Sequence, residues 1–128
     1  MDPYLLISIG GILGANARYL VSTWAASRIS VSFPYGTLIV NGSGSFLMGL
    51  FLTMLADRFR GSPQASLLVA TGYLGAYTTF STFTYETIAL ARRAAIRAAM
   101  INALGSVGAG IVGAMLGMLV ATGLRDRI

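Results

Sequence analysis

The sequence predicts an all-α integral membrane protein, with four transmembrane helices in one domain that covers residues 1–128. Of its 128 residues, 55% are hydrophobic and only 10% are charged, and the mean hydropathy of +0.75 lies far outside the range of soluble domains. A spanning helix takes about 20 residues, so four spans use most of the chain and leave only short loops. No room remains for a catalytic domain outside the membrane.

The first predicted span covers about residues 4–24 and ends at Trp24, where an aromatic side chain suits the membrane interface. Ala15-Asn16-Ala17 imitates a signal-peptidase site. However, Asp2 occupies the region where a signal peptide carries Lys or Arg, so we expect a retained helix.

The other three spans are separated by turn residues. Pro34-Tyr35-Gly36 predicts a turn before a second span over about 37–56, and Gly61-Ser62-Pro63 predicts a break before a third over about 64–90. The fourth span covers about 94–122. No low-complexity tract or linker divides the chain, which favours a single domain.

The third span is unusually polar in its middle. Between Thr78 and Thr87, six of ten residues are Ser or Thr, and two glycines lie just upstream. Ser and Thr side chains compete for backbone hydrogen bonds, which favours a helix broken mid-membrane, buried in protein or facing water. The alternative is an intact helix whose hydroxyls bond back to the preceding turn.

The basic residues are nine arginines, and they give a net charge of +5. They flank apolar blocks, which favours anionic lipid headgroups over nucleic acid as the partner. Loop arginines and Arg18 divide four against five between the two sides, too small a bias to fix an orientation. Either one arginine dominates insertion, or the chain inserts both ways and pairs with its own inverted copy.

Several classes of chemistry are excluded by composition. The chain has no Cys and no His, so it has no disulfide, no thiolate nucleophile, no Cys metal site and no histidine proton shuttle. No nucleotide motif or catalytic constellation is present, and we expect no enzyme.

Two ionisable residues lie within spans, Arg18 and Glu86, and an intramembrane charge suggests function. Alternatively, Arg18 reaches the headgroups along its apolar stem, and Glu86 is solvated near a helix end. The first span carries no acid, which argues against a small proton-coupled exporter of cations.

Small and polar residues recur every four positions in the second and fourth spans. Asn41, Ser45 and Gly49 form one such stripe, against which another helix can pack. In the fourth span the stripe of Gly105, Ala109, Gly113 and Gly117 indicates helix packing. A further stripe, Asn102, Ser106 and Gly110, is either interhelical glue or the wall of a polar track.

Three motifs coincide with a known pattern. They are Gly10-Gly11-Ile12-Leu13-Gly14-Ala15-Asn16-Ala17-Arg18-Tyr19, the stretch from Pro34-Tyr35-Gly36-Thr37 through Asn41 to Gly49, and the stretch from Gly72 to Glu86 with its Thr-Thr-Phe-Ser-Thr-Phe core. Together they cover nearly the whole chain, which resembles the Fluc (CrcB-type) fluoride channel family.

The resemblance implies an antiparallel, dual-topology homodimer of four-helix subunits in the inner (plasma) membrane, with two pores. By the same resemblance, fluoride leaves the cell through these pores, which lowers its toxicity. The resemblance also implies a central structural Na⁺ held by the backbone carbonyls of Gly75 and Thr78. The implied fluoride pathway comprises Asn41, Phe80, Phe83, Ser81, Thr82, Asn102 and Ser106. Arg18 and Glu86 also fall on family positions, with an electrostatic or structural role. Fluoride, sodium, membrane lipids and a second copy of the chain are the expected partners, and nucleic acid is not.

The sequence departs from the family's usual pattern at three positions: Ala76, where a second Gly is common; Gly42, where a bulkier apolar residue is usual; and Asn102, where some members have Tyr. Two other classes of function compete with a channel. One is a small four-helix antiporter exchanging protons for a cationic drug, and the other is a membrane scaffold in which the small-residue stripes serve only assembly.

Overall fold

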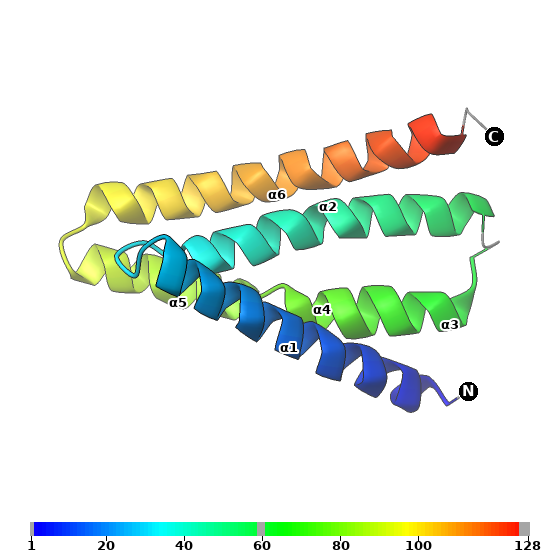
Figure 1. Ribbon diagram of the computed structural model, residues 1–128. Coiled ribbons are helices and arrows are strands. Elements are labelled where there is room, and N and C mark those ends of the chain that lie inside the picture. The colour runs from blue at the N-terminus through cyan, green and yellow to red at the C-terminus, as the bar shows by residue number, and fades with distance from the viewer. Residues whose placement is uncertain (1, 59–60, 126–128) are drawn as a thin grey trace.

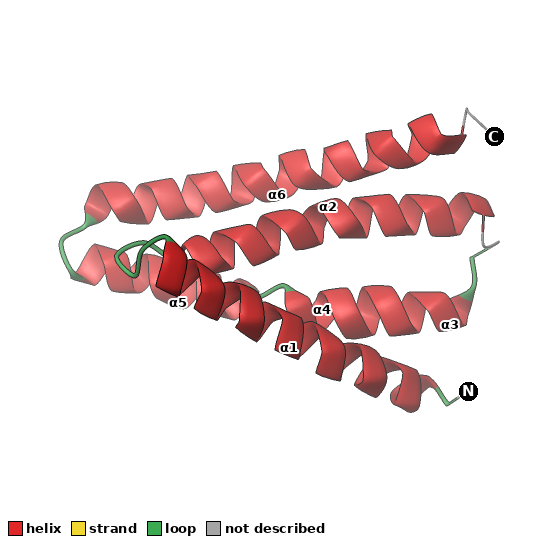
Figure 2. Cartoon of the chain, viewed as in Figure 1, coloured by secondary structure: helices red, strands yellow, loops and turns green. Residues whose placement is uncertain are grey.

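The computed structural model describes residues 2–58 and 61–125 and shows an all-helical bundle (Figures 1 and 2). Its order is α1 (Pro3–Arg28), α2 (Tyr35–Arg58), α3 (Pro63–Ala65), a π-helix η1 (Ser66–Leu74), α4 (Gly75–Tyr77), α5 (Phe80–Arg92) and α6 (Ile96–Arg125). The described residues contain no strand, and four helical passes cross the bundle, with α3 to α5 forming the third. The prediction of an all-α protein with four helical passes is confirmed.

Both ends of the first helix are stabilised as the sequence allows. The Asp2 carboxylate accepts hydrogen bonds from the amides of Tyr4 and Leu5, at 2.8 and 3.3 Å, and Pro3 occupies the first turn. Arg28 lies in the last turn, where its charge complements the helix dipole. The helix ends at Arg28, about one turn beyond Trp24.

Within the described residues, three helices are long and apolar enough to cross a membrane: Pro3–Arg28, Tyr35–Ala56 and Ile96–Leu124. The third pass is divided into pieces that are each shorter than a span. The start of α1 and the end of α6 lie at one end of the bundle, and the α1–α2 and α5–α6 connections lie at the other (Figure 1). This arrangement is that of a multi-pass membrane protein.

Glycines set the closest approaches between the helices. A side chain at Gly10 or Gly14 of α1 would collide with the carbonyl oxygen of Leu68 or Tyr73 in η1. In the same way, Gly117 of α6 lies against the backbone of Phe46, while Gly49 of α2 lies against that of Ala114. Backbone therefore meets backbone in two pairs of elements, α1 with η1 and α2 with α6, as small residues permit in membrane helices.

The outer surface is apolar along most of its length. Large side chains on α1 and α6 are exposed, including Leu20 at 66%, Leu104 at 71% and Leu119 at 63%. Such a surface suits lipid or another protein surface in the membrane, and it would be costly in water.

Candidate functional site at the interruption of the third pass

The third helical pass is interrupted at Thr78 and Thr79. Both residues are extended, with φ/ψ of −83°/158° and −150°/118°, between the end of α4 at Tyr77 and the start of α5 at Phe80. The Thr79 hydroxyl caps α5 by accepting a hydrogen bond from the Thr82 amide at 3.2 Å. The interruption lies within the hydroxyl-rich stretch.

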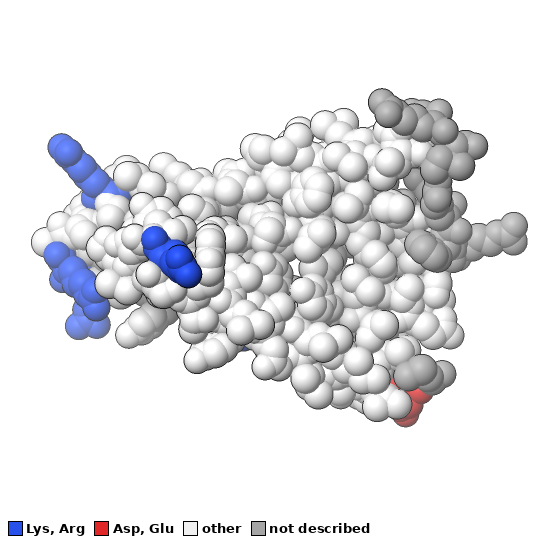
Figure 3. All heavy atoms as spheres, in the orientation of Figure 1, with Lys and Arg blue, Asp and Glu red and all other residues white. Residues whose placement is uncertain are grey.

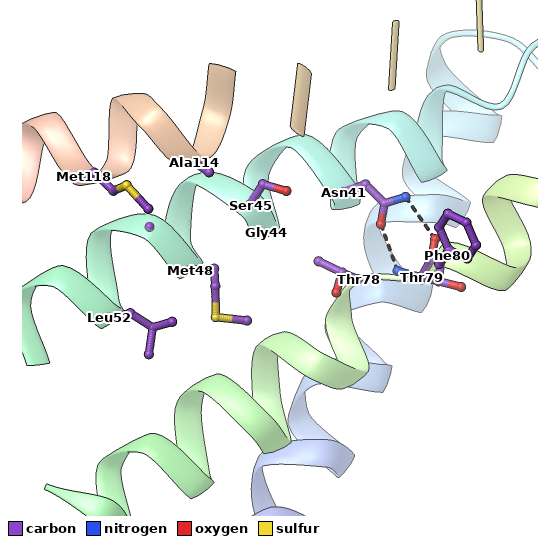
Figure 4. A pocket seen from close by; sticks show the side chains of 11 residues that line it. Asn41, Gly44, Ser45, Met48, Leu52, Thr78, Thr79, Phe80, Ala114 and Met118 are labelled. Carbon is purple, nitrogen blue, oxygen red and sulfur yellow. Dashed lines mark hydrogen bonds between the residues drawn. The ribbon is translucent and has the colours of Figure 1, made fainter. Parts of the chain in front are cut away.

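Asn41 of α2 holds the interruption in place with both halves of its side-chain amide. Its Nδ2 donates to the Thr79 carbonyl at 3.0 Å, and its Oδ1 accepts from the Thr79 amide at 2.8 Å (Figure 4). The bond to Oδ1 replaces the one that the Thr79 amide would make in a continuous helix, whereas the bond from Nδ2 is an additional one to the carbonyl of the residue that caps α5. We call this arrangement the Asn41 clamp.

The clamp and the cap change which backbone groups are paired. In a continuous helix the amides of Thr79 and Thr82 would donate to the carbonyls of Gly75 and Thr78. Here they donate to Asn41 Oδ1 and Thr79 Oγ1 instead. The two carbonyl oxygens therefore lose their helical donors, at the negative end of one helix and beside the positive end of the next.

A cavity of about 390 Å³ opens beside the interruption (Figure 4). Polar lining comes from Asn41, Ser45, Thr78 and Thr79, and the remaining lining residues are Gly44, Met48, Gly49, Leu52, Phe80, Ala114 and Met118. Gly44 is required for this geometry, because a side chain there would collide with the Thr78 methyl group. The cavity therefore joins α2, α6 and the start of α5.

The two phenylalanines of α5 have different environments. Phe80 lines the cavity and is 76% exposed, whereas Phe83 is 9% exposed and lies in the core. Their ring centroids are 5.8 Å apart with an angle of 50° between the planes, in the range of favourable tilted pairs. Phe83 thus supports the ring that faces the opening.

Ser81 and Thr82 lie exposed in the first turn of α5. Thr82 also lines a second cavity of about 290 Å³, together with Glu86. The Thr37 hydroxyl donates to Glu86 Oε1 at 2.9 Å, while Oε2 is buried and has no hydrogen-bond partner among the described residues. Glu86 is thus placed inside the bundle, facing α2.

Asn102 and Ser106 lie in a separate buried cluster between α6 and α5. Ser106 donates to Asn102 at 3.3 Å, Asn102 donates to the Thr87 hydroxyl at 2.8 Å, and Thr87 donates to the Phe83 carbonyl at 2.8 Å. Neither residue lines the first cavity. The structure therefore connects them to the site through Phe83 and not by direct contact.

Arg18 lies half-buried on α1 and lines none of the cavities described here. Gly75 is exposed, and Thr78 is half-buried at the cavity wall. In the part of the chain that the structure describes, no group of three or more acidic side chains could hold a metal ion.

Sequence reasoning missed several residues of the site. Thr79 is both the cap of α5 and the target of the clamp, and Thr37 and Thr87 bind the side chains of Glu86 and Asn102. The only available signal was a threonine just before a helical stretch, which is typical of a cap. The partners lie up to 49 residues away, so no local pattern indicates them.

Fold and site together define a multi-pass helical membrane protein whose polar groups gather at an interrupted helix. The family described as "CrcB-like protein, Camphor Resistance (CrcB)" matches residues 5–118, and the chain belongs to this family. The resemblance predicted from the motifs is therefore confirmed.

Relatives from several bacteria agree. A protein of Acidobacterium capsulatum is 45% identical over 91% of this chain and 94% of its own length, and one of Roseiflexus sp. is 47% identical over the same shares. A protein of Legionella pneumophila is 42% identical over 94% of this chain and 93% of its own length. Each carries the name "Fluoride-specific ion channel FluC".

Proposed function

We propose that this chain forms a passive, fluoride-selective channel that lets fluoride leave the cytoplasm. The observation that carries the proposal is the clamped interruption, which places Asn41 and the exposed ring of Phe80 at one cavity, where polar groups of Thr78 and Thr79 also lie. Membership of a family whose relatives are named fluoride channels supports it. The cationic drug antiporter is not favoured, since α1 carries no acid between its two ends.

Fluoride is small and strongly hydrated, so its passage requires donors that replace water. At the start of α5, the amides of Phe80 and Ser81 form the positive end of the helix dipole, and the hydroxyls of Ser81 and Thr82 are exposed beside them. The edge of an aromatic ring is also positive, so Phe80 can stabilise an anion edge-on. Several weak sites allow the ion to move on, whereas one deep site would trap it.

The fluoride pathway that we propose continues from Phe80 through Phe83 to the buried cluster of Asn102 and Ser106. The hydrogen bond from Thr87 to the Phe83 carbonyl links these groups in the protomer. The Ser106 and Thr87 hydroxyls and one N–H of Asn102 donate in these bonds, which leaves the second N–H of Asn102 for an entering anion. Arg18 and Glu86 act in this proposal on the electrostatics or the packing around the pathway.

A structural sodium ion fits the backbone at the interruption. The carbonyl oxygens of Gly75 and Thr78 have lost their helical donors, Gly75 is exposed, and carbonyl oxygen suits a hard monovalent cation. These two residues would hold the ion, and it would supply a positive charge beside the interruption. Two such pairs, one from each of two subunits, would give four oxygens.

An antiparallel homodimer would complete the site. In a single subunit Phe80, Ser81 and Gly75 are exposed, although irregular backbone at membrane depth must be buried in protein or face water. The near-equal division of arginines between the two ends suits insertion in both orientations. A second, inverted copy would cover the interruption and leave a polar path between the subunits.

In the cell the channel would act in the inner (plasma) membrane. Hydrogen fluoride is a weak acid that enters neutral and dissociates inside, which leaves the anion trapped. A passive pore then lets fluoride leave down its electrochemical gradient, and toxicity falls without an energy source.

Flux from liposomes containing the purified protein tests this function. We expect fluoride to leave, as measured by a fluoride electrode, while chloride stays, and we expect no proton-driven uptake of a cationic dye. Equal fluoride and chloride efflux would contradict selectivity, and dye uptake coupled to a pH gradient would support the antiporter. No flux of any kind would favour the scaffold.

A further inference from the structure

A groove runs along the outer side of α6, beside the start of α2, and it does not take part in the site described above. It has a volume of about 590 Å³, and a second hollow of about 520 Å³ adjoins it. Arg97, Ile101 and Gly105 line both hollows. The other residues of the larger one are Phe33, Tyr35, Leu38, Ala98 and Ala109.

The groove is polar at one end and apolar along the rest. Arg97 is exposed in the first turn of α6, and beyond it the lining from Ile101 to Ala109 carries no charged group. Phe33 and Tyr35, with ring centroids 4.9 Å apart, flank the same end as Arg97. Aromatic and arginine side chains at one level are typical of the membrane interface.

The length of the groove matches one leaflet. Arg97 and Ala109 are twelve residues apart on a continuous helix, which corresponds to about 18 Å. The hydrocarbon core of a bilayer is about 30 Å thick, so the groove extends from the interface to near the midplane. The groove is open at Gly105: this residue has no side chain, and a Cβ added there would meet no atom within 4 Å.

The charge of Arg97 calls for an anion. Side chains of two acidic residues are described, and both are engaged elsewhere: Asp2 caps α1, and Glu86 accepts from Thr37. On the visible face, basic atoms gather at the end of the bundle that carries the α5–α6 connection, and acidic atoms appear only at the other end (Figure 3). This end is therefore strongly basic among the described residues.

We infer that this groove binds an anionic phospholipid, with the phosphate headgroup on Arg97 and one acyl chain along Ile101, Gly105 and Ala109. An aliphatic chain fills an apolar channel of leaflet length, and the headgroup supplies the missing negative charge. The inference concerns the outer side of α6 and does not depend on fluoride conduction.

Tryptophan quenching by brominated lipid tests the inference. Replacing the single natural tryptophan, Trp24→Phe, and adding Ile101→Trp places one indole in the groove. We expect brominated phosphatidylglycerol to reach half-maximal quenching at a mole fraction about fivefold lower than brominated phosphatidylcholine. One arginine near the surface strengthens the binding of an anionic headgroup by about this factor.

Two matched pairs of variants locate the site. Arg97→Gln should make the two lipids equal, whereas Arg92→Gln, at an exposed arginine of the same end that lines neither hollow, should keep the fivefold preference. Gly105→Leu should reduce quenching by filling the groove, and Gly108→Leu, at an equally open position outside it, should not.

Equal quenching by the two lipids in the protein that keeps Arg97 would overturn the inference, because the groove would then only be wetted by bulk lipid. Absence of quenching by either lipid would overturn it too and would indicate a second copy of the chain in the groove. If Arg97→Gln fails to fold, the preference measured with Arg97 in place still decides.

Discussion

At the scale of single residues, Asn41 holds the interruption through its side chain, and in the proposed function it also lies on the fluoride pathway. Both halves of its amide bind the backbone of Thr79, which leaves one of its two N–H groups for another acceptor. Sequence motifs indicated an amide near a pore, and the structure adds that the same amide holds the interrupted backbone. A substitution there should affect both the fold and the flux.

The variant Asn41→Asp tests whether Asn41 needs both the donor and the acceptor of its amide or only a polar side chain. The carboxylate still accepts from the Thr79 amide, but it cannot donate to the Thr79 carbonyl, and it brings a negative charge beside the anion path. We expect a loss of about 1–3 kcal/mol in the free energy of unfolding, and no fluoride flux. Thermal unfolding of the purified protein measures the first effect.

Asn16→Asp is the control for that experiment. Asn16 is exposed and binds only the Ile12 carbonyl of its own helix, at 2.7 Å, so its change adds the same charge to a span without breaking a contact between elements, and it should cost less than Asn41→Asp. Equal losses for the two variants would mean that the clamp does not stabilise the interruption.

Phe80 and Phe83 should respond differently to the same substitution. Phe80→Ile changes an exposed ring, so the protomer should lose no more than about 0.5 kcal/mol while fluoride flux is lost with the ring's positive edge. Phe83→Ile changes a core residue and should cost about 1–2 kcal/mol as well as flux.

The variant Phe80→Met provides an intermediate case, because the polarisable methionine side chain fills the same space without a ring edge. A flux result counts only for a variant that elutes normally in size-exclusion chromatography. Undiminished fluoride efflux from a folded Phe80→Ile protein would show that the ring only packs.

At the scale of elements, glycines decide which helices touch. Gly14 of α1 faces the Tyr73 carbonyl of η1, whereas Gly11, three residues earlier, has open space where a side chain would be. Gly14→Ala should therefore destabilise the protein by forcing α1 and η1 apart. Gly11→Ala should raise the free energy of unfolding by up to about 1 kcal/mol, because alanine is the better helix former.

Thermal unfolding of the two variants under the same conditions measures these opposite signs. A Gly14→Ala protein as stable as Gly11→Ala would contradict the close packing of α1 on η1.

Some of the elements followed from the sequence and others did not. Hydropathy and turn residues such as Pro34 and Gly61 predicted helical passes and where they separate, because these effects are local. The nine-residue π-helix from Ser66 to Leu74 had no local signal. It forms where Gly10 and Gly14 bring another backbone against it, and such tertiary packing is not visible in a single stretch of sequence.

The candidate site was predictable to a similar degree. Motifs singled out Asn41, Phe80 and Phe83, and the structure brings them to one interruption. The stripe on the fourth pass was expected to pack along its length. In the structure Gly113 and Gly117 meet α2, while a side chain at Gly105 would meet nothing. Periodicity predicts which face of a helix packs against another helix, but only the angle between the two helices decides how far along that face they touch.

At the scale of the whole molecule, an antiparallel dimer predicts that each end of the bundle faces one side of the membrane in one subunit and the other side in its partner. The protein has no natural cysteine, so Val31→Cys, at a position 84% exposed in the α1–α2 connection, gives a unique label. In intact cells a membrane-impermeant maleimide should label about half of the protein, and the rest should react after the cells are opened.

Gly61→Cys, two residues before α3, which begins at the opposite end of the bundle (Figure 1), should behave in the same way. Complete labelling of one position from outside and none of the other would mean a single orientation, which contradicts the antiparallel dimer.

The most direct test of the central claim, a passive fluoride-selective pore, is the reversal potential of the protein in a planar bilayer, with fluoride on one side and chloride at the same concentration on the other. A fluoride channel predicts current that reverses at a large potential, of the sign that opposes fluoride flow. Reversal near zero would show that chloride passes as well as fluoride and would contradict the claim.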